Sequence, residues 1–288
     1  MAGAAVTEFE GSAEAGSEAG AEIGSGIDAA STSRGTSVRY TPGREPLRVG
    51  RPLVVAIDGP SGSGKSSVSK EVARRLRLAY LDTGAMYRAV TWDCLDRGLD
   101  LTDSALVEAS ARALDLELST SADREHVSVR GHDVTEEIRK PGISSCVSAV
   151  ATNLGVRDEL IRRQRALIAA HGRRMVVEGR DITTVVARDA EVRLLLTASE
   201  EARMRRRGLQ LGGTQSAEAL AEQVVERDRR DSAVASFTRA ADGVYTVDSS
   251  DLDFEETVGA VLDVVLAVVG GHRPAPDPAT TSYEGEPA

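Results

Sequence analysis

Residues 59–67 have the sequence GPSGSGKSS, and the segments on both sides of this stretch decide the fold. Before it lies LVVAID, residues 53–58, an apolar and β-branched run with the length of a buried strand. After it, residues 66–76 place apolar side chains at helical spacing with charged side chains between them. A flexible glycine–serine linker is the alternative, but the flanking strand and helix argue against it. The stretch therefore predicts a strand–loop–helix unit.

The loop itself matches the phosphate-binding pattern G-x-x-x-x-G-K-[ST]. Glycines let successive backbone N–H groups point at phosphate oxygens, and the first helical turn adds unpaired N–H groups and a partial positive charge. Lys65 can reach the β- and γ-phosphates, and Ser66 can ligate Mg²⁺. We therefore predict a site for a nucleoside triphosphate with Mg²⁺. Its predicted residues are Gly59, Pro60, Ser61, Gly62, Ser63, Gly64, Lys65, Ser66 and Ser67, with Ser66 as the metal ligand.

The composition of the 288-residue chain separates a folded part from two polar ends. Residues 1–47 predict a disordered acidic arm, and the proline-rich residues 271–288 predict a disordered tail, which leaves residues 48–270 for one α/β domain. The sequence offers no apolar signal segment, no run of the ~20 apolar residues that span a bilayer and no metal-ligand spacing of its two cysteines. The net charge of −10 opposes nucleic-acid binding. We expect a cytoplasmic protein with neither a nucleic-acid nor a membrane partner.

Strand and helix patterns alternate along the folded part. Strands are expected at 53–58, 78–81, 175–177, 192–196 and 244–247, with two further short strands at 116–118 and 127–129. Helices are expected at 66–76, 85–97, 103–114, 156–170, 199–210, 216–231 and 254–269. This alternation predicts an α/β fold, a parallel five-stranded P-loop NTPase core with helices on both faces. In such a sheet, ligands bind at the carboxyl ends of the strands.

The arginines indicate which chemistry the triphosphate serves. A GTPase switch needs an Asn-Lys-x-Asp segment, and the sole asparagine, Asn153, is followed by leucine. Phosphoryl transfer needs stabilisation of charge on the moving group, and guanidinium forks suit phosphate oxygens. Arg88 and Arg180 follow the ends of predicted strands, which favours function over a solvated helix face. The arginine-rich segment 199–231 is expected to form a short lid that closes over the triphosphate.

Five segments, in the same order, resemble the bacterial cytidylate kinases. They are IDGPSGSGKSSVSKEVA, YLDTGAMYRA, IRRQRALI, VVEGRDITTVV and ERDRRDS, and the resemblance runs from about residue 53 to about residue 266. It implies a phosphotransferase of pyrimidine nucleotide metabolism that moves the γ-phosphate of ATP to CMP or dCMP, giving ADP and CDP or dCDP, with Mg²⁺ as cofactor. It also implies a monomer in which residues 98–145 form the monophosphate-binding insert.

The resemblance assigns roles to individual residues. The CMP-binding residues that it implies are Thr83, Tyr87, Arg88, Ser148, Arg157, Arg180, Asp181, Arg227 and Asp231. The catalytic residues that it implies are Lys65, Arg88, Arg180 and Asp181. Asp181, a cytosine reader together with Ser148 and Arg157, would accept a hydrogen bond from the N4 amino group, where uracil presents a carbonyl. The carboxylate could also pair internally with an arginine, and the two roles are compatible.

The sequence departs from the family pattern at two places. Thr183 stands where the family usually has glycine, and a positive φ there would cost a β-branched residue on the order of 1–3 kcal/mol. After Asp231 and Ser232 the family usually continues with a Thr- or Ser-Arg pair and then Pro-Leu, whereas this chain continues AVASF, residues 233–237. An arginine expected to bind the acceptor is therefore missing. Two alternatives stay open: a diverged nucleotide-binding paralogue with weak or no kinase activity, or a kinase for another small acceptor.

Overall fold

The computed structural model describes residues 50–210 and 237–271. The acidic arm, the expected helix at 216–231 and all but the first residue of the expected tail lie outside the described residues. The strands are β1 (Leu53–Asp58), β2 (Ala79–Asp82), β3 (Leu116–Leu118), β4 (Val127–Val129), β5 (His132–Asp133), β6 (Arg174–Gly179), β7 (Val192–Thr197) and β8 (Tyr245–Asp248). The helices are α1 (Lys65–Leu76), α2 (Thr83–Asp96), α3 (Ser104–Ala113), α4 (Pro141–Ala151), α5 (Leu154–Ala170), α6 (Glu200–Gln210) and α8 (Phe254–Val269).

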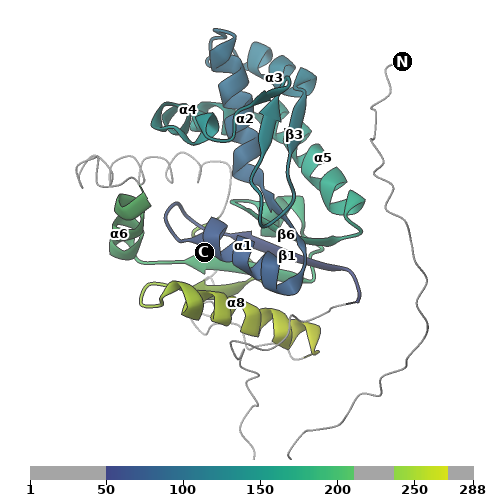
Figure 1. The fold of residues 1–288 in the computed structure, drawn as a ribbon, viewed down its shortest axis with the longest axis vertical. Coiled ribbons are helices and arrows are strands. Elements are labelled where there is room, and N and C mark those ends of the chain that lie inside the picture. The colour runs from purple at the N-terminus through teal and green to yellow at the C-terminus, as the bar shows by residue number, and fades with distance from the viewer. Residues whose placement is uncertain (1–49, 211–236, 272–288) are drawn as a thin grey trace, which may run out of the picture. The chain divides into compact units, whose positions relative to one another are not determined.

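Five parallel strands form the central sheet in the order β2-β6-β1-β7-β8. Successive side chains of the central strand β1 enter different cores, because neighbouring residues of a strand point to opposite faces. Leu53, Val55 and Ile57 pack in the core covered by α1 and α8. Val54 and Ala56 pack in the core covered by α2 and α5. Figure 1 shows α1 and α8 together on one face of the sheet. The predicted α/β fold with five parallel strands and helices on both faces is confirmed.

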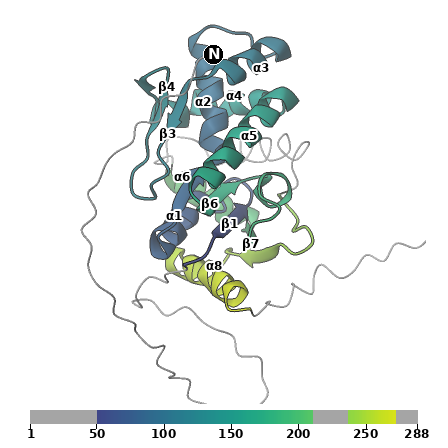
Figure 2. The ribbon, with the colours of Figure 1, turned by 90° about the vertical axis from the view of Figure 1, so that its right-hand side faces the viewer.

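A second, antiparallel sheet of order β3-β4-β5 lies within the expected insert, residues 98–145. Its apolar residues Val127 and Val129 join the core cluster that also holds side chains of α2 and α5. In Figure 2 this small sheet and α3 lie beside α2 and α5, on the side of the main sheet away from α8. The sequence did not predict α4, which crosses residue 145, where we placed the end of the insert.

Side-chain caps begin two of the helices that carry residues of the site. The Asp82 carboxylate, at the end of β2, accepts a hydrogen bond from the Ala85 backbone N–H at 2.9 Å and so begins α2. The Asn153 side chain begins α5 in the same way through the Val156 N–H. Each cap fixes where the following helix places its first polar side chains. Arg88 of α2 and Arg157 of α5 both line the pocket described below.

Candidate active site

The phosphate-binding loop joins the end of β1 to the start of α1. Gly64 has φ of 87°, a left-handed conformation that glycine adopts without a steric cost, and the helix begins at the next residue. Gly59 lies so close to β7 that a Cβ there would stand 2.3 Å from the Leu196 carbonyl oxygen. Only glycine fits at this position. The loop is thereby held against the sheet, with the start of α1 facing the pocket.

One pocket collects most of the predicted site residues. It is lined by Ser61, Gly62, Gly64, Lys65, Ser66, Ser67, Thr83, Tyr87, Arg88, Arg157, Arg180 and Asp181 from the predicted set. Gly59, Pro60 and Ser63 belong to the same loop but do not line the pocket, and Ser148 is buried in α4 beside the lining residue Val147. Arg227 and Asp231 lie outside the described residues. The pocket is lined by residues of the segments that follow β1, β2 and β6, so it lies at the carboxyl ends of these strands.

The pocket also holds charged residues to which the sequence analysis assigned no role. They are Asp82, Glu178, Lys70 and Arg139. Asp82 and Glu178 stand at or next to the ends of β2 and β6, within the segments that the strand-end rule marks for ligand binding. Arg139 gave no such signal, because it lies in a short 3-10 turn far along the chain from the loop.

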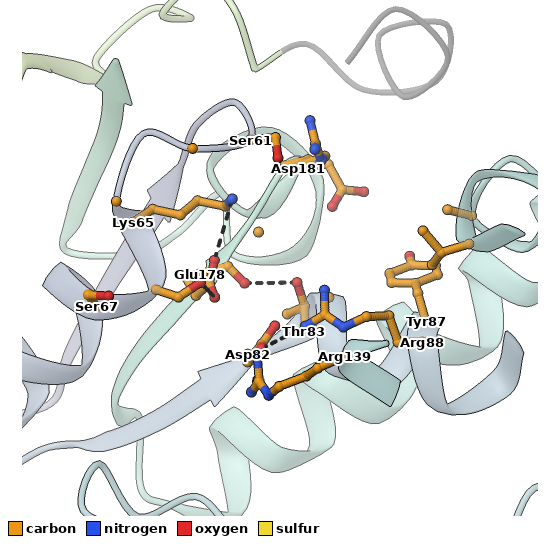
Figure 3. A pocket seen from close by; sticks show the side chains of 18 of the residues that line it. Ser61, Lys65, Ser67, Asp82, Thr83, Tyr87, Arg88, Arg139, Glu178 and Asp181 are labelled. Atoms are coloured by element: carbon orange, nitrogen blue, oxygen red, sulfur yellow. Dashed lines mark hydrogen bonds and ion pairs between the residues drawn. The ribbon is translucent and has the colours of Figure 1, made fainter. Parts of the chain in front are cut away.

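Glu178 links the phosphate-binding loop to β6. Its carboxylate accepts a hydrogen bond from the Ser66 hydroxyl at 2.6 Å and lies 3.9 Å from the Lys65 ammonium (Figure 3). Burial, together with the negative charge of Asp82, raises the pKa of Glu178, while Lys65 opposes this shift. A hydroxyl, a carboxylate and an ammonium group therefore meet where the loop enters α1.

Asp82, the register partner of Glu178 on the neighbouring strand β2, contacts two arginines. Its carboxylate lies 2.9 Å from the Arg88 guanidinium and 3.7 Å from that of Arg139 (Figure 3). Burial alone would raise the pKa of Asp82, but the positive charges of Arg88 and Arg139 outweigh it and hold the pKa below its usual value. Arg139 also pairs with Glu125 at 2.6 Å. The carboxylate thus orients guanidinium groups from α2 and from the insert toward one pocket.

Asp181 and Arg157 form a buried ion pair at the third part of the pocket. The Asp181 carboxylate lies 2.5 Å from the Arg157 guanidinium, which comes from α5. Burial raises the pKa of Asp181, and the charge of Arg157 opposes that shift. Nearby, the Thr83 hydroxyl donates a hydrogen bond to the Glu178 carbonyl oxygen at 2.8 Å. The predicted internal pairing of Asp181 with an arginine is therefore present.

Thr183 is not strained, so the concern about a positive φ at this position is wrong. Within the described residues, the non-glycine residues with positive φ are Arg77, Arg130 and Arg173. Thr183 instead lies in a short π-helical turn over Ile182–Val186, with a backbone conformation outside the left-handed region. Its hydroxyl donates a hydrogen bond to the buried Asp58 carboxylate at 2.6 Å. The substitution therefore adds a hydrogen bond and no backbone strain.

The described start of the expected lid contacts the phosphate-binding loop. Arg203 of α6 donates a hydrogen bond to the Ser61 carbonyl oxygen at 3.1 Å, and Arg206 donates one to the Ser63 carbonyl oxygen at 3.3 Å. The start of α6 is therefore bound to the phosphate-binding loop through two of the loop's backbone carbonyls. No helix in the described ranges is both long and apolar enough to cross a membrane.

Comparison with known proteins decides the family. Residues 55–267 match the family model described as cytidylate kinase. The chain belongs to the cytidylate kinase family. It is 49% identical over 215 residues to the cytidylate kinase of Cutibacterium acnes, an alignment that covers 74% of this chain and 96% of the relative. It is 47% identical over 223 residues to the cytidylate kinase of Rhodococcus jostii, which covers 76% and 96% of the two chains. A third relative, the cytidylate kinase of Nocardia farcinica, is 48% identical over 220 residues, covering 74% and 94%.

Membership in the cytidylate kinase family settles the class of the enzyme. The predicted resemblance is confirmed, and with it the prediction of a nucleoside monophosphate kinase that binds nucleotides through a P-loop. The family model spans β1 through most of α8, which includes every element that contributes to the pocket. The match therefore covers the whole of the pocket described above.

Proposed function

We propose that the protein transfers the γ-phosphate of ATP to CMP or dCMP, with ADP and CDP or dCDP as products. The observation that carries the proposal is the single pocket lined by Lys65 of the phosphate-binding loop, by Arg88, and by the Arg157–Asp181 pair. Lys65 suits the triphosphate of ATP, Arg88 suits the phosphate of the acceptor, and the Arg157–Asp181 pair suits the base. A phosphate oxygen of the acceptor attacks the γ-phosphorus, and the bond from that phosphorus to the β-phosphate oxygen breaks. The chain supplies positioning and positive charge for this displacement.

The donor end of the pocket is formed by the loop and Glu178. Backbone N–H groups at the start of α1 and the Lys65 ammonium would bind the phosphates of ATP. Ser66 and Glu178 fit a Mg²⁺ ion, because a hydroxyl and a carboxylate already lie 2.6 Å apart and Mg²⁺ prefers oxygen ligands. Within the described residues no group of three or more metal-ligating side chains occurs, so phosphates and water would complete the coordination. When bound, the ion neutralises phosphate charge.

The acceptor end would hold the monophosphate between arginines. Arg88 and Arg139 approach Asp82 from two different elements, and Arg180 lines the same pocket. Planar guanidinium groups bind phosphate oxygens through two parallel N–H donors, which fixes orientation as well as charge. Thr83 and Tyr87 line the same wall. Arg227 and Asp231 stay predictions for the ribose.

The Asp181–Arg157 pair would read the base. Cytosine presents an amino donor at N4 beside acceptors at N3 and O2, so a carboxylate and a guanidinium complement it. Uracil presents a carbonyl at position 4, which would face the Asp181 carboxylate without a hydrogen bond. Ser148 remains a predicted contributor from α4, where its neighbour Val147 lines the pocket.

A coupled assay of ADP formation tests the proposal. Mg-ATP is offered with CMP, dCMP, UMP, AMP, GMP and dTMP, to the wild type and to Lys65→Ala and Asp181→Ala. We expect turnover led by CMP and dCMP, lost in Lys65→Ala, and with weaker base preference in Asp181→Ala. Bound ATP without transfer to any acceptor would support the diverged paralogue, and turnover of another acceptor would support a kinase for another small acceptor; the comparisons favour neither. The cytoplasmic location and the monomeric state remain predictions.

A further inference from the structure

Asp58 is a buried carboxylate to which the proposed function assigns no role. It ends β1, directly before Gly59 of the phosphate-binding loop, and only 1% of its surface is exposed. It is not among the residues that line the pocket. A charge is costly to bury unless hydrogen bonds compensate for the lost water. The hydrogen bonds of this carboxylate therefore indicate what it stabilises.

The partners of Asp58 lie in one short turn. Within the described residues, its carboxylate accepts three hydrogen bonds, all from the π-helical turn over Ile182–Val186. The backbone N–H groups of Ile182 and Thr183 donate at 2.9 Å and 2.8 Å, and the Thr183 hydroxyl donates at 2.6 Å. The first N–H groups of a helical turn have no partner within that turn. Asp58 therefore caps the turn from a different strand.

Asp181 stands at the position that would ordinarily supply this cap. It directly precedes the turn, and aspartate is among the residue types that cap helices best with their own side chain. The Asp181 side chain makes no capping hydrogen bond. Its carboxylate instead lies 2.5 Å from the Arg157 guanidinium, among the residues that line the pocket (Figure 3). Because Asp58 supplies the cap, the Asp181 carboxylate is available to face Arg157.

The other end of the same turn is bound from α5. The Arg165 guanidinium donates hydrogen bonds to the Val185 carbonyl oxygen at 2.7 Å and to the Val186 carbonyl oxygen at 3.0 Å. A carboxylate at the N–H end and a guanidinium at the carbonyl end both match the dipole of a helical turn. The turn is therefore held at both ends by other elements, and Asp58 holds the end that adjoins Asp181.

We propose that Asp58 is a positioning residue that caps the turn after Asp181 and thereby keeps the Asp181 carboxylate directed at Arg157 and at the base of the acceptor nucleotide. The inference rests on the proposed function, because it assigns the reading of cytosine to Asp181. Without the cap, the N–H groups at the start of the turn compete with Arg157 for the Asp181 carboxylate. The loss should therefore appear in base preference, and it should depend on Asp181.

A double-mutant cycle on base preference tests this dependence. The full-length wild type, Asp58→Asn, Asp181→Ala and the double variant are compared at pH 8, with saturating Mg-ATP, by the ratio of kcat/KM for CMP to that for UMP. The amide at position 58 keeps the shape of the carboxylate, but its NH₂ group cannot accept a hydrogen bond from the turn. We expect Asp58→Asn to lower the ratio about 3- to 30-fold, with the KM for ATP within about threefold. On the Asp181→Ala background, it should have no further effect on the ratio.

Asp93→Asn is the matched control. Asp93 is equally buried, at 1% exposed, and it pairs with Arg130 at 2.7 Å without lining the pocket. Its substitution should leave the base preference unchanged, even where it lowers stability. Thermal unfolding is recorded for every variant. If Asp58→Asn does not fold, Thr183→Val removes one hydrogen bond to the same carboxylate and should lower the ratio in the same direction.

Three results separate the inference from its alternatives. An unchanged ratio in folded Asp58→Asn, or in Thr183→Val where it replaces that variant, would overturn the inference. An equal fall with and without the Asp181 side chain would overturn it too, because Asp58 would then act through another group. A wild type that shows no preference for CMP over UMP would instead refute the proposed function, and the inference would fall with it.

Discussion

Thr183 donates two hydrogen bonds to one oxygen of the Asp58 carboxylate, 2.6 Å from its hydroxyl and 2.8 Å from its backbone nitrogen. Asp58 directly precedes the phosphate-binding loop, and Thr183 follows Asp181 by two residues. The Ile182 N–H donates to the other carboxylate oxygen at 2.9 Å. The carboxylate therefore joins the triphosphate loop to the turn proposed to read the base. A glycine at position 183 would supply the N–H donor but not the hydroxyl.

The Asp58 contact predicts a pH-dependent cost for Thr183→Val. Burial raises the pKa of Asp58 from 3.8 to about 6, although the hydrogen bonds from Thr183 oppose the shift. A folded-state pKa above the unfolded value means that the carboxyl contributes stability below about pH 4, which is lost as pH rises through about 6. Removing a donor to the ionised form should raise this pKa further. The loss in free energy of unfolding should be about 1.5–3 kcal/mol at pH 8 and smaller at pH 5.

Denaturant unfolding at pH 5 and pH 8 checks the Thr183 prediction. Thr184→Val, at the next position of the same turn, serves as the control for a lost hydroxyl. Thr183→Ser should retain most of the stability because it keeps the donor. An equal loss for Thr183→Val at both pH values would show that the hydroxyl does not act on the charge of Asp58.

Glu178→Gln should weaken the use of Mg²⁺. The change removes the negative charge beside Ser66 and Lys65 but keeps the size of the side chain. We expect a 10- to 100-fold higher Mg²⁺ concentration for half-maximal activity, with the KM for CMP within about threefold. Tyr80→Phe is the control, because it removes another hydrogen bond to Glu178 while leaving the charge. If Mg²⁺ titrations of activity coincide for Glu178→Gln and the wild type, the carboxylate has no part in holding the ion.

Asp181→Asn should relax the preference for cytosine. The amide can donate a hydrogen bond to the uracil carbonyl, whereas the carboxylate cannot, and Arg157 loses its charged partner. We expect the ratio of kcat/KM for CMP to that for UMP to fall by at least about tenfold. Asp158→Asn, at an exposed position of α5, controls for the loss of one negative charge. An unchanged ratio would mean that Asp181 serves only to pair Arg157.

Arg139→Met should weaken binding of the acceptor phosphate. The change removes a charge that lies 3.7 Å from Asp82 at the pocket wall, while the apolar stem is retained. We expect the KM for CMP to rise about tenfold or more and the KM for ATP to change little, because the loop that binds ATP is separate. Arg112→Met is the control, since that arginine pairs with Glu108 on the same helix. If the KM for CMP and the KM for ATP rose equally, Arg139 would stabilise the fold and would have no specific role in binding the acceptor.

The sequence predicted the elements of the sheet well, because buried parallel strands are continuous apolar runs. All five strands of the main sheet and the helices at 66–76, 103–114 and 156–170 were found to within a few residues. Helix α4 was missed although its segment, PGISSCVSAVA, carried the signals of a helix: proline at the start and apolar residues at Ile143, Val147 and Val150. The expected helix at 216–231 lies outside the described residues.

The sequence was less informative about contacts between distant residues. The loop pattern singled out Lys65 and Ser66, since their spacing is local. Their partner Glu178 lies 112 residues from Ser66, and its place at a strand end marks it for the site without showing that it contacts the loop. Arg139 likewise reaches the pocket only because the insert folds back over α2. Such residues become visible once strand order is known.

By itself, the sequence determined the fold class, the phosphate-binding loop and the family. Each of these can be recognised from short segments: the alternating strands and helices, the glycine-rich motif, and the five segments shared with the family. The tertiary structure decided that Thr183 donates a hydrogen bond to Asp58 instead of straining the backbone, and that the Arg180 guanidinium lies over the Phe237 ring. Both contacts depend on the positions of two segments far apart in the chain. The pairing of β1 with β6 brings Asp58 close to Thr183. The position of Phe237, ahead of strand β8, brings its ring to Arg180.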